Sequence, residues 1–360
     1  MKRTKKLVTI VLACAIALLG TSCAGEGASS SALSGGSSTT GTSSVQGVSS
    51  EAASQSSNYP LTISTFNFAK EPVEETFTKA PERVICAWQN SVETMLALGL
   101  EDRIICTIGV TKDDITPALQ DAYDKIADKE YNSFSDSNAA ISKETAIMLE
   151  PDFILAWKST FNDKTLGDVD YWHENGVNTY MALNSNDISA NRTVENEYQD
   201  ILTVGKIFDV ADKAQEIVDE MKAAVEKVTK ATEGQEKKTV LVVEFLGGKI
   251  RVYDKTMLAG NMVQEMGGDL LDVSGTIGAE DIIKLDPDVL YVIHMEGYGE
   301  GAGSEALKNI TEDPAYSSLR ANAEGHVYPL NLSDVYTSGI RTLDGLNAIG
   351  KTLYPELYQE

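Results

Sequence analysis

The chain has 360 residues, and its 30 Lys and Arg against 54 Asp and Glu give a formal net charge of −24 at pH 7. Hydrophobic residues make up 42% and charged residues 23%, which is ordinary for a folded soluble protein, and the length favours two domains. Nucleic-acid binding depends on Lys and Arg at the phosphates, so this charge argues against that function. It also argues against a basic patch that docks on anionic lipid.

The first 22 residues have the pattern of a secretion signal. Lys and Arg side chains within residues 2–6 precede a short apolar run at 7–19, which is too short for an ordinary membrane-spanning helix. Small residues then lead to Cys23, as in a bacterial lipobox, although Gly20 stands where that pattern prefers Leu. The pattern predicts cleavage before Cys23 and lipidation of its thiol. A plain signal peptide with an incidental Cys is the alternative.

A Ser- and Gly-rich segment follows at 23–58, with 13 Ser and 6 Gly among residues 24–58. Because it holds few apolar side chains, burial cannot offset the entropy lost on ordering, and no fold is expected. As a flexible coil it would span roughly 30–35 Å. We predict that it tethers a globular body to the outer face of the bacterial cytoplasmic membrane through Cys23.

The body alternates short apolar runs with helical patterns from Tyr59 onward. Five runs rich in Val, Ile and Leu are predicted as buried strands, at 83–87, 103–108, 153–157, 239–245 and 289–293. Continuous apolar strands are typical of parallel sheets covered on both faces by crossover helices. The sequence therefore predicts an α/β fold with two Rossmann-like lobes, each built on a central parallel sheet.

Two segments of the body echo one another and support two lobes of similar plan. Residues 142–152 and 278–288 each contain Glu, then Leu five positions later, then Pro-Asp before an apolar strand. In each segment Pro ends a short helix. Apolar residues recur at helical spacing within 195–232, which predicts a long, stiff connecting helix. The predicted organisation is an N-terminal lobe at 59–194, connecting helices at 195–232, and a C-terminal lobe with a closing helix at 233–360.

Cys86 and Cys106 are the two Cys residues of the body, and each lies late in a predicted strand. A disulfide is permitted outside the cell, and the two strands could be neighbours in a sheet. Two buried free thiols are the other interpretation. No C-x-x-C occurs, so a Cys-based zinc site is not expected.

Several short motifs follow one another between residues 60 and 358. They are Pro81-Glu82-Arg83-Val84, Ser91-Val92-Glu93, Glu144 through Asp152, Met266-Gly267-Gly268, Glu280 through Asp288, Gly325-His326-Val327-Tyr328 and Tyr354-Pro355-Glu356. Together with the lipobox, this ordered set resembles the substrate-binding lipoproteins of ABC importers. The specific resemblance is to the group that binds iron–siderophore complexes, haem or cobalamin between two lobes joined by a rigid helix.

The resemblance implies a receptor that is not an enzyme, with its ligand in the cleft where strand carboxyl ends face each other. The implied ligand contacts are Trp88, Gln89, Asn90, Trp157 and Lys158 in the first lobe, and Glu244, Phe245, Arg251, Tyr253, His294, Tyr336 and Arg341 in the second. The aromatic members could stack on a macrocycle or catechol ring, and the cationic members could meet an anionic ferric chelate. Core packing of the aromatic rings, and an ion pair of Arg341 with Asp344, are the alternatives.

The resemblance also implies partners. Glu144 in the first lobe and Glu265 in the second are predicted to dock on basic pockets of a membrane permease, and a solvated surface Glu is the alternative for each. No Walker A motif occurs, so the ATPase is expected to be a separate chain. We expect a monomer without a resident cofactor, and the rigid connector predicts only a small closure of the lobes.

The predicted cargo is a ferric siderophore complex or haem. Cobalamin or another corrinoid is the first alternative, because Ala156-Trp157-Lys158 resembles the Ala-Trp-Arg segment of cobalamin receptors. A bare metal or oxyanion receptor comes next, and a surface enzyme on the same scaffold comes last. The three histidines, His173, His294 and His326, lie on different predicted elements, so no zinc or manganese site is expected, although His294 could be an axial ligand to haem or cobalt.

Overall fold

The computed structural model describes residues 58–126, 141–185, 189–295, 301 and 303–359. The predicted signal peptide, the lipidation site Cys23 and all but the last residue of the predicted tether lie outside the described residues. Within the described part, no helix is both long enough and apolar enough to cross a membrane.

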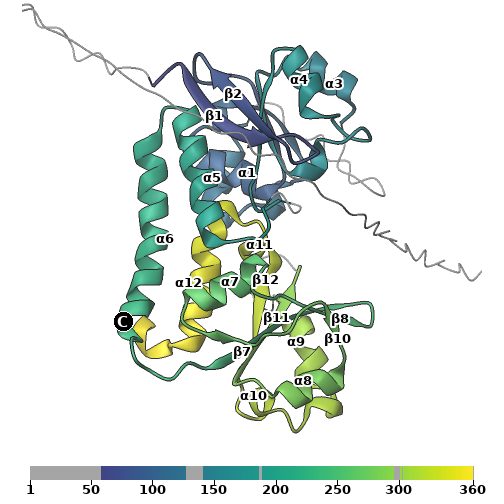
Figure 1. Cartoon of the computed structure of the whole chain (residues 1–360), viewed down its shortest axis with the longest axis vertical. Helices are drawn as coiled ribbons and strands as arrows, with labels where there is room; N and C mark the ends of the chain where they lie inside the picture. The colour runs from purple at the N-terminus through teal and green to yellow at the C-terminus, as the bar shows by residue number, and fades with distance from the viewer. Residues whose placement is uncertain (1–57, 127–140, 186–188, 296–300, 302, 360) are drawn as a thin grey trace, which may run out of the picture. The chain divides into compact units, whose positions relative to one another are not determined.

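The first lobe is built on a parallel sheet of four strands in the order β4-β3-β5-β6. Its strands are β3 (Val84–Ala87), β4 (Ile104–Ile108), β5 (Phe153–Ala156) and β6 (Asn178–Met181). Every residue of β3 and β5 is buried, as expected for central strands covered on both faces. An antiparallel hairpin of β1 (Leu61–Phe66) and β2 (Pro72–Phe77) contacts β6, and Figure 1 shows these elements at the top. The helices of this lobe are α1 (Gln89–Ala97), α2 (Gln120–Tyr123), α3 (Lys143–Met148) and α4 (Val169–Glu174).

The second lobe has a mixed sheet in the order β10-β8-β7-β11-β12, with β9 also beside β7. Its strands are β7 (Thr239–Leu246), β8 (Lys249–Val252), β9 (Asp269–Leu270), β10 (Thr276–Ile277), β11 (Val289–His294) and β12 (Val327–Asn331). The α/β plan is confirmed, but this sheet is not parallel throughout, because β8 and β10 are antiparallel to their neighbours. Gly247 and Gly248 both have positive φ, which suits the two-residue turn that folds β8 back on β7.

Helices cover both faces of the second sheet and close the chain. They are α7 (Leu258–Glu265), α8 (Ala279–Leu285), α9 (Ser304–Thr311), α10 (Arg320–Ala323), α11 (Leu332–Val335) and α12 (Thr342–Leu353). Short 3-10 turns complete the two lobes: η1 (Glu101–Arg103), η2 (Lys112–Asp114), η3 (Pro117–Leu119), η4 (Lys158–Thr160), η5 (Pro314–Tyr316), η6 (Gly339–Arg341) and η7 (Pro355–Tyr358).

Two helices, α5 (Val194–Ile207) and α6 (Ala211–Ala231), connect the lobes where the sequence predicts connecting helices. The long helix α6 buries Ala214, Val218, Met221 and Val228 on one stripe, at the spacing of an amphipathic helix. This stripe packs on α5 and α12, and Figure 1 shows α6 running alongside both. One continuous apolar core joins side chains of β3, β5, α5, α6, β7, β11 and α12. The lobes are therefore coupled through a shared core as well as through the chain.

The repeated Pro-Asp motif performs the same local task in both lobes. The Asp152 carboxylate, just before β5, accepts from the backbone N–H groups of Glu82 and Arg83 at 2.8 Å, next to the start of β3. The Asp288 carboxylate, just before β11, accepts from the N–H of Thr239 at 2.7 Å, at the start of β7. Each Asp satisfies backbone donors where the neighbouring strand begins. The echo thus reflects two lobes assembled in the same way.

Cys86 and Cys106 are buried free thiols on adjacent strands. The register pairs Cys106 with Ile85, one residue away from Cys86. Successive side chains of a strand alternate between faces, so the two thiols point to opposite sides of the sheet. They accordingly belong to different apolar clusters.

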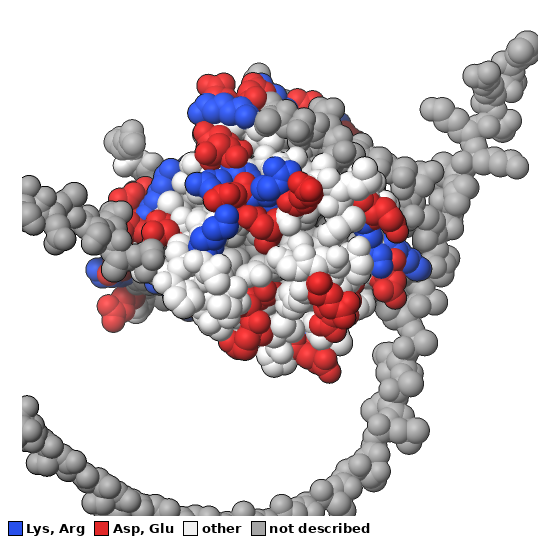
Figure 2. Space-filling view, turned by 90° about the horizontal axis from the view of Figure 1, so that it is seen from above, with Lys and Arg blue, Asp and Glu red and all other residues white. Residues whose placement is uncertain are grey.

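Charged side chains of both signs are mixed on the face seen from above in Figure 2. Lys and Arg there are interspersed with Asp and Glu, and no continuous basic patch forms among the described residues of this face. The described residues of this face do not offer the basic stripe that nucleic-acid binding requires.

Candidate functional site

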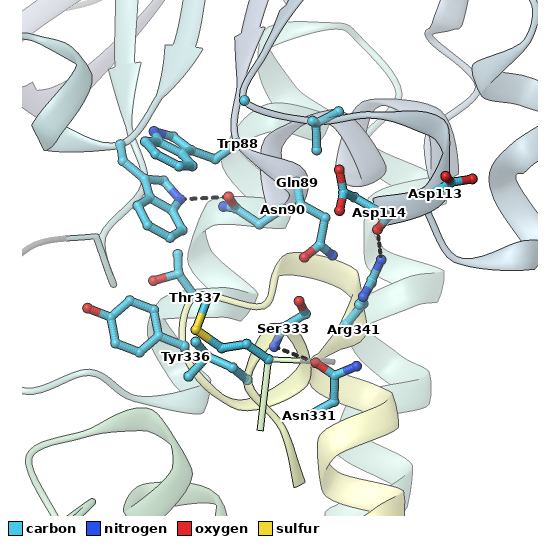
Figure 3. A pocket seen from close by; sticks show the side chains of 15 residues that line it. Trp88, Gln89, Asn90, Asp113, Asp114, Asn331, Ser333, Tyr336, Thr337 and Arg341 are labelled. Carbon is cyan, nitrogen blue, oxygen red and sulfur yellow. Dashed lines mark hydrogen bonds between the residues drawn. The ribbon is translucent and has the colours of Figure 1, made fainter. Parts of the chain in front are cut away.

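A cavity of about 280 Å³ lies between the lobes, at the carboxyl ends of strands from both sheets. Residues from each side face it in Figure 3. Its lining comes from the segments that follow β3, β4, β5, β11 and β12: Trp88, Gln89, Asn90, Gly109, Val110, Asp113, Asp114, Trp157, Met295, Asn331, Leu332, Ser333, Tyr336, Thr337 and Arg341. Ligands of open α/β sheets bind beyond the carboxyl ends of strands, so this cavity is the candidate site.

An aromatic stack forms the first-lobe wall of the cavity. The rings of Trp88 and Trp157 lie 4.7 Å apart at an interplanar angle of 18°, and the ring of Tyr336 lies 6.0 Å from Trp157. Trp157 Nε1 donates to Asn90 Oδ1 at 2.7 Å, and Trp88 Nε1 donates to Thr160 Oγ1 at 3.0 Å. Both indole N–H groups are therefore satisfied within the protein. The stack offers a ligand a fixed, apolar surface.

The backbone of Trp88 adopts a conformation that is essentially reserved for glycine. Trp88 caps the start of α1 with φ 73° and ψ 153°. A non-glycine residue in this region costs of order 1–3 kcal/mol and is found mainly at functional sites. The surrounding hydrogen bonds hold it there: Trp88 N donates to Ile108 O at 2.9 Å, and Trp88 O accepts from Val92 N at 3.2 Å. In this backbone conformation the indole of Trp88 packs against Trp157 and forms part of the cavity wall.

A buried ion pair joins the two lobes beneath the cavity. Arg341, in η6 of the second lobe, donates from Nε and Nη2 to the two carboxylate oxygens of Glu93, on α1 of the first lobe, both at 2.6 Å. The two side chains are 1% and 0% exposed. Glu93 also accepts from Thr116 N at 2.6 Å and from Gln89 Nε2 at 2.5 Å. Arg341 is thus buried and paired with Glu93, whereas the alternative interpretation supposed a surface ion pair with Asp344.

The segment before Arg341 is also fastened to the first lobe. The buried Glu197 on α5 accepts from Ser338 N at 3.1 Å and from Gly339 N at 2.7 Å, and Thr337 Oγ1 donates to Asn184 O at 3.1 Å. Gly339 has φ 55°, and a Cβ there would lie 2.8 Å from Thr94 Oγ1 on α1. Only glycine allows this close approach. The inner end of the cavity is therefore bridged from both lobes.

Burial raises the pKa of carboxyl groups around this bridge. Desolvation raises the pKa of Glu197, against the lowering effect of its hydrogen bonds. Burial, followed by the negative charges of Asp344 and Glu93, raises the pKa of Asp334 to about 8. Asp334 Oδ1 lies 3.9 Å from Arg341 Nη1. The hydrogen bonds of the Arg341 guanidinium to a carboxylate thus go to Glu93, and the Asp334 carboxylate lies farther away.

The cavity brings together six of the twelve predicted ligand contacts: Trp88, Gln89, Asn90, Trp157, Tyr336 and Arg341. The other six lie outside its lining. Lys158 Nζ lies 4.4 Å from the centre of the Phe68 ring, and His294 is buried as the last residue of β11. Three of the remaining four form their own cluster on β7 and around β8, where Tyr253 donates to Glu244 at 2.9 Å and Arg251 lies 3.6 Å from it. Phe245 is partly buried and packs against an apolar cluster of the second lobe.

The two predicted docking residues are both exposed. Glu144 lies in the first turn of α3, and Glu265 is the last residue of α7. The two positions are not equivalent, since the echo of Glu144 in the second lobe is Glu280 in the first turn of α8. Their roles stay predictions.

Several lining residues escaped the sequence-based prediction. Gly109, Val110, Asp113 and Asp114 follow β4, and the rule that selected residues after β3 and β5 applies equally to this strand. Asn331 is the last residue of β12 and Ser333 follows it in α11, where Ser333 N donates to Asn331 Oδ1 at 3.1 Å. Glu93 lies within the motif Ser91-Val92-Glu93, but nothing in that motif indicates a partner 248 residues away.

No group of three or more His, Cys, Asp or Glu among the described residues is arranged to hold a metal ion. The cavity instead presents aromatic rings, side-chain amides and hydroxyls, and a few charged groups. Such a lining is suited to a whole organic molecule or metal complex held by packing and hydrogen bonds.

The family model and the similar curated protein point to the same class of protein. A family model described as periplasmic binding protein matches residues 84–331. The ABC transporter substrate-binding lipoprotein YvrC of Bacillus subtilis (strain 168) is 23% identical over 318 residues, which cover 86% of this chain and 91% of that protein.

Two solved structures extend the comparison. A periplasmic binding protein from Veillonella parvula DSM 2008 is 32% identical, with a TM-score of 0.76 over 83% of this chain and 93% of that chain. An ABC-type Fe3+-hydroxamate transport system from Saccharomonospora viridis DSM 43017 has the same fold, with a TM-score of 0.63 at 24% identity over 82% of this chain and 99% of that chain.

Proposed function

Because the chain belongs to the periplasmic binding protein family, we propose that it captures a ferric siderophore complex or haem outside the cell and delivers it to a membrane permease. It is the substrate-binding component of an ABC importer of the iron/siderophore type, and not an enzyme. Such components work with a permease and an ATPase.

The observation that carries the proposal is the aromatic cavity between the lobes. Trp88, Trp157 and Tyr336 present ring surfaces beside the amides of Gln89, Asn90 and Asn331. Flat or partly planar complexes with apolar faces and a polar rim match this combination. A bare ion would need converging ligands, and none of the described His, Cys, Asp and Glu residues form such a group.

The cargo is tested by melting temperature. The mature chain carrying Cys23→Ser is heated with ferric trihydroxamates, ferric catecholates, haem, cobalamin, molybdate, Zn²⁺ and Mn²⁺. One ferric complex at about a hundredfold excess over its Kd is expected to raise Tm by about 5 °C or more, through about 2.7 kcal/mol of added stability. Cobalamin alone as the stabilising compound would select the corrinoid alternative. A shift with a bare ion or oxyanion alone would overturn the proposal.

We propose that the mature protein is held at the outer face of the membrane by a lipid on Cys23. The B. subtilis relative is a substrate-binding lipoprotein, and the residues around Cys23 match a lipobox. Residues 24–58, with 13 Ser and 6 Gly, would then be the tether between the lipid and the folded body. A receptor held this way stays close to its permease and raises the rate of encounter.

The repeat of the two lobes sharpens the docking proposal. Glu144 and Glu280 are both exposed residues in the first turn of the helix before a Pro-Asp motif. A permease with two like halves would recognise two like positions on its receptor. We therefore place the second docking carboxylate at Glu280 in preference to Glu265.

Transport assays separate these residues. Glu144→Ala and Glu280→Ala are each expected to lower cargo uptake by roughly threefold to tenfold, through lost charge complementarity, with ligand affinity unchanged. Glu236→Ala removes an exposed carboxylate from the segment between α6 and β7 and serves as the control. A loss of uptake in Glu265→Ala with full uptake in Glu280→Ala would restore the original assignment.

A further inference from the structure

The charges around the cavity do not match an anionic cargo. Among the fifteen lining residues, the charged side chains are Arg341, Asp113 and Asp114. The guanidinium of Arg341 is bound by both carboxylate oxygens of Glu93 at 2.6 Å, so these two charges cancel within a buried pair. Asp113 and Asp114 are exposed and leave the described lining with two negative charges. In Figure 3 the Asp114 carboxylate lies near Gln89, and the Asp113 carboxylate lies farther out, at the edge away from the tryptophan rings.

The Lys and Arg side chains near the cavity contact groups outside the pair of Asp113 and Asp114. Lys112, next to Asp113 in η2, pairs with Asp124 at 2.5 Å. Arg192 stacks on the Tyr336 ring at 4.2 Å and is not part of the lining, while Lys158 lies over Phe68. None of these three cations is among the residues that line the cavity.

The Asp114 side chain is fixed in place. Its Oδ2 accepts from Thr111 N at 2.7 Å and from Thr111 Oγ1 at 2.8 Å, which caps η2. These hydrogen bonds hold the carboxylate in place but bring no positive charge to it. The negative charge at this edge of the cavity is therefore built into the local fold.

We propose, on the basis of the importer function above, that this cavity selects uncharged or cationic metal complexes and discriminates against anionic ones. Aromatic faces attract cations and tolerate neutral rings, and two carboxylates at the rim repel a complex with net negative charge. The cargo class is then a neutral or cationic ferric complex of hydroxamate type, and the ferric tricatecholates, which are strongly anionic, are excluded.

The charge of the cavity can be measured without knowing the cargo. The chain has 3 Trp, and Trp172 is buried away from the cavity, so Trp172→Phe leaves Trp88 and Trp157 as reporters. Their fluorescence is quenched with iodide, caesium and neutral acrylamide at fixed ionic strength. Adding Asp113→Asn and Asp114→Asn is expected to raise iodide quenching roughly twofold and to lower caesium quenching, with acrylamide unaffected. Asn can still accept the hydrogen bonds that cap η2.

A matched control removes the same charge elsewhere. Asp212→Asn with Asp219→Asn takes two carboxylates from α6, outside the lining, and is expected to leave both ionic quenchers nearly unchanged. Equal changes in the cavity variant and this control would overturn the proposal, because the effect would then belong to the net charge of the whole protein.

The selectivity itself is tested on one chelate scaffold. A linear ferric trihydroxamate with a free terminal amine is cationic, its acetylated form is neutral and its succinylated form is anionic. Affinity is expected to fall roughly tenfold from the cationic to the anionic form, and the difference is expected to shrink in Asp113→Asn with Asp114→Asn. Tighter binding of the anionic form would overturn the proposal. If no form binds, the hydroxamate cargo fails, and the quenching result decides the charge of the cavity independently.

Discussion

Replacement of Arg341 by Met is expected to destabilise the protein by about 3–5 kcal/mol, because it leaves the buried Glu93 carboxylate without its counter-charge. Glu93 is 0% exposed, and two of its hydrogen bonds come from Arg341. Glu93→Gln removes the charge; its single carbonyl oxygen can still accept from Thr116 N, and its NH2 group can donate to Gln89 once the Gln89 amide turns to present its oxygen. The double variant Glu93→Gln with Arg341→Met is expected to lose less than the sum of the single losses, with a coupling of about 1–3 kcal/mol.

Urea unfolding followed by circular dichroism gives these free energies, and Arg103→Met provides the control. Arg103 is 37% exposed and lies 3.9 Å from Asp102, so its loss is expected to cost less than about 1 kcal/mol. If Arg341→Met were no more destabilising than Arg103→Met, the ion pair would not be what joins η6 to α1.

Trp88→Gly is expected to be more stable than Trp88→Ala by about 1–3 kcal/mol, which reverses the usual order of the two residues. The reason is the backbone of Trp88, at φ 73° and ψ 153°, which glycine adopts without strain and alanine does not. Both variants lose the ring that stacks on Trp157. Ligand affinity is therefore expected to fall about tenfold or more in both, while stability separates them.

The stacking partner supplies a matched control. Trp157 has φ −81° and ψ 157°, an ordinary extended conformation. Trp157→Gly should accordingly be less stable than Trp157→Ala by about 0.5–1 kcal/mol, in the usual order. Urea unfolding of the four variants measures both differences. The same order at the two positions would mean that Trp88 carries no strain, and full ligand affinity in all four would remove the stack from the binding site.

The parts of the fold that local patterns determine could be predicted from the sequence. Continuous apolar runs located the central strands, and the two Pro-Asp segments located the start of equivalent strands in both lobes. The antiparallel strand β8 was not predicted, although Gly247-Gly248 between two apolar stretches is a recognisable hairpin signal. Because β8 was not predicted, the sheet of the second lobe was expected to be parallel throughout.

Part of the candidate site could also be predicted, since side chains after parallel strands meet at one edge of a sheet. That rule brought Trp88 and Trp157 into the cavity, and the C-terminal segment added Tyr336. Glu244 and Arg251 were expected there as well, but the turn into β8 holds them in a separate cluster. The pairing of Arg341 with Glu93 spans 248 positions and depends on how the lobes meet, which no local pattern records.

Contacts that were not visible in the sequence bear on how far the two lobes can move relative to each other. A shared apolar core and the bridge of η6 to α1 and α5 join the lobes on the inner side of the cavity. Opening the lobes would expose or separate buried charges, which is costly. These contacts support the prediction that closure on ligand binding is small.

The central claim is that the aromatic cavity between the lobes holds the cargo. It is tested most directly by titrating the Trp172→Phe protein, whose remaining tryptophans, Trp88 and Trp157, both line that cavity, with the ferric complex that raises Tm. Saturable quenching of their fluorescence, with the same Kd as calorimetry gives, is the predicted result. Tight calorimetric binding with unchanged tryptophan fluorescence would contradict the claim and place the cargo elsewhere on the protein.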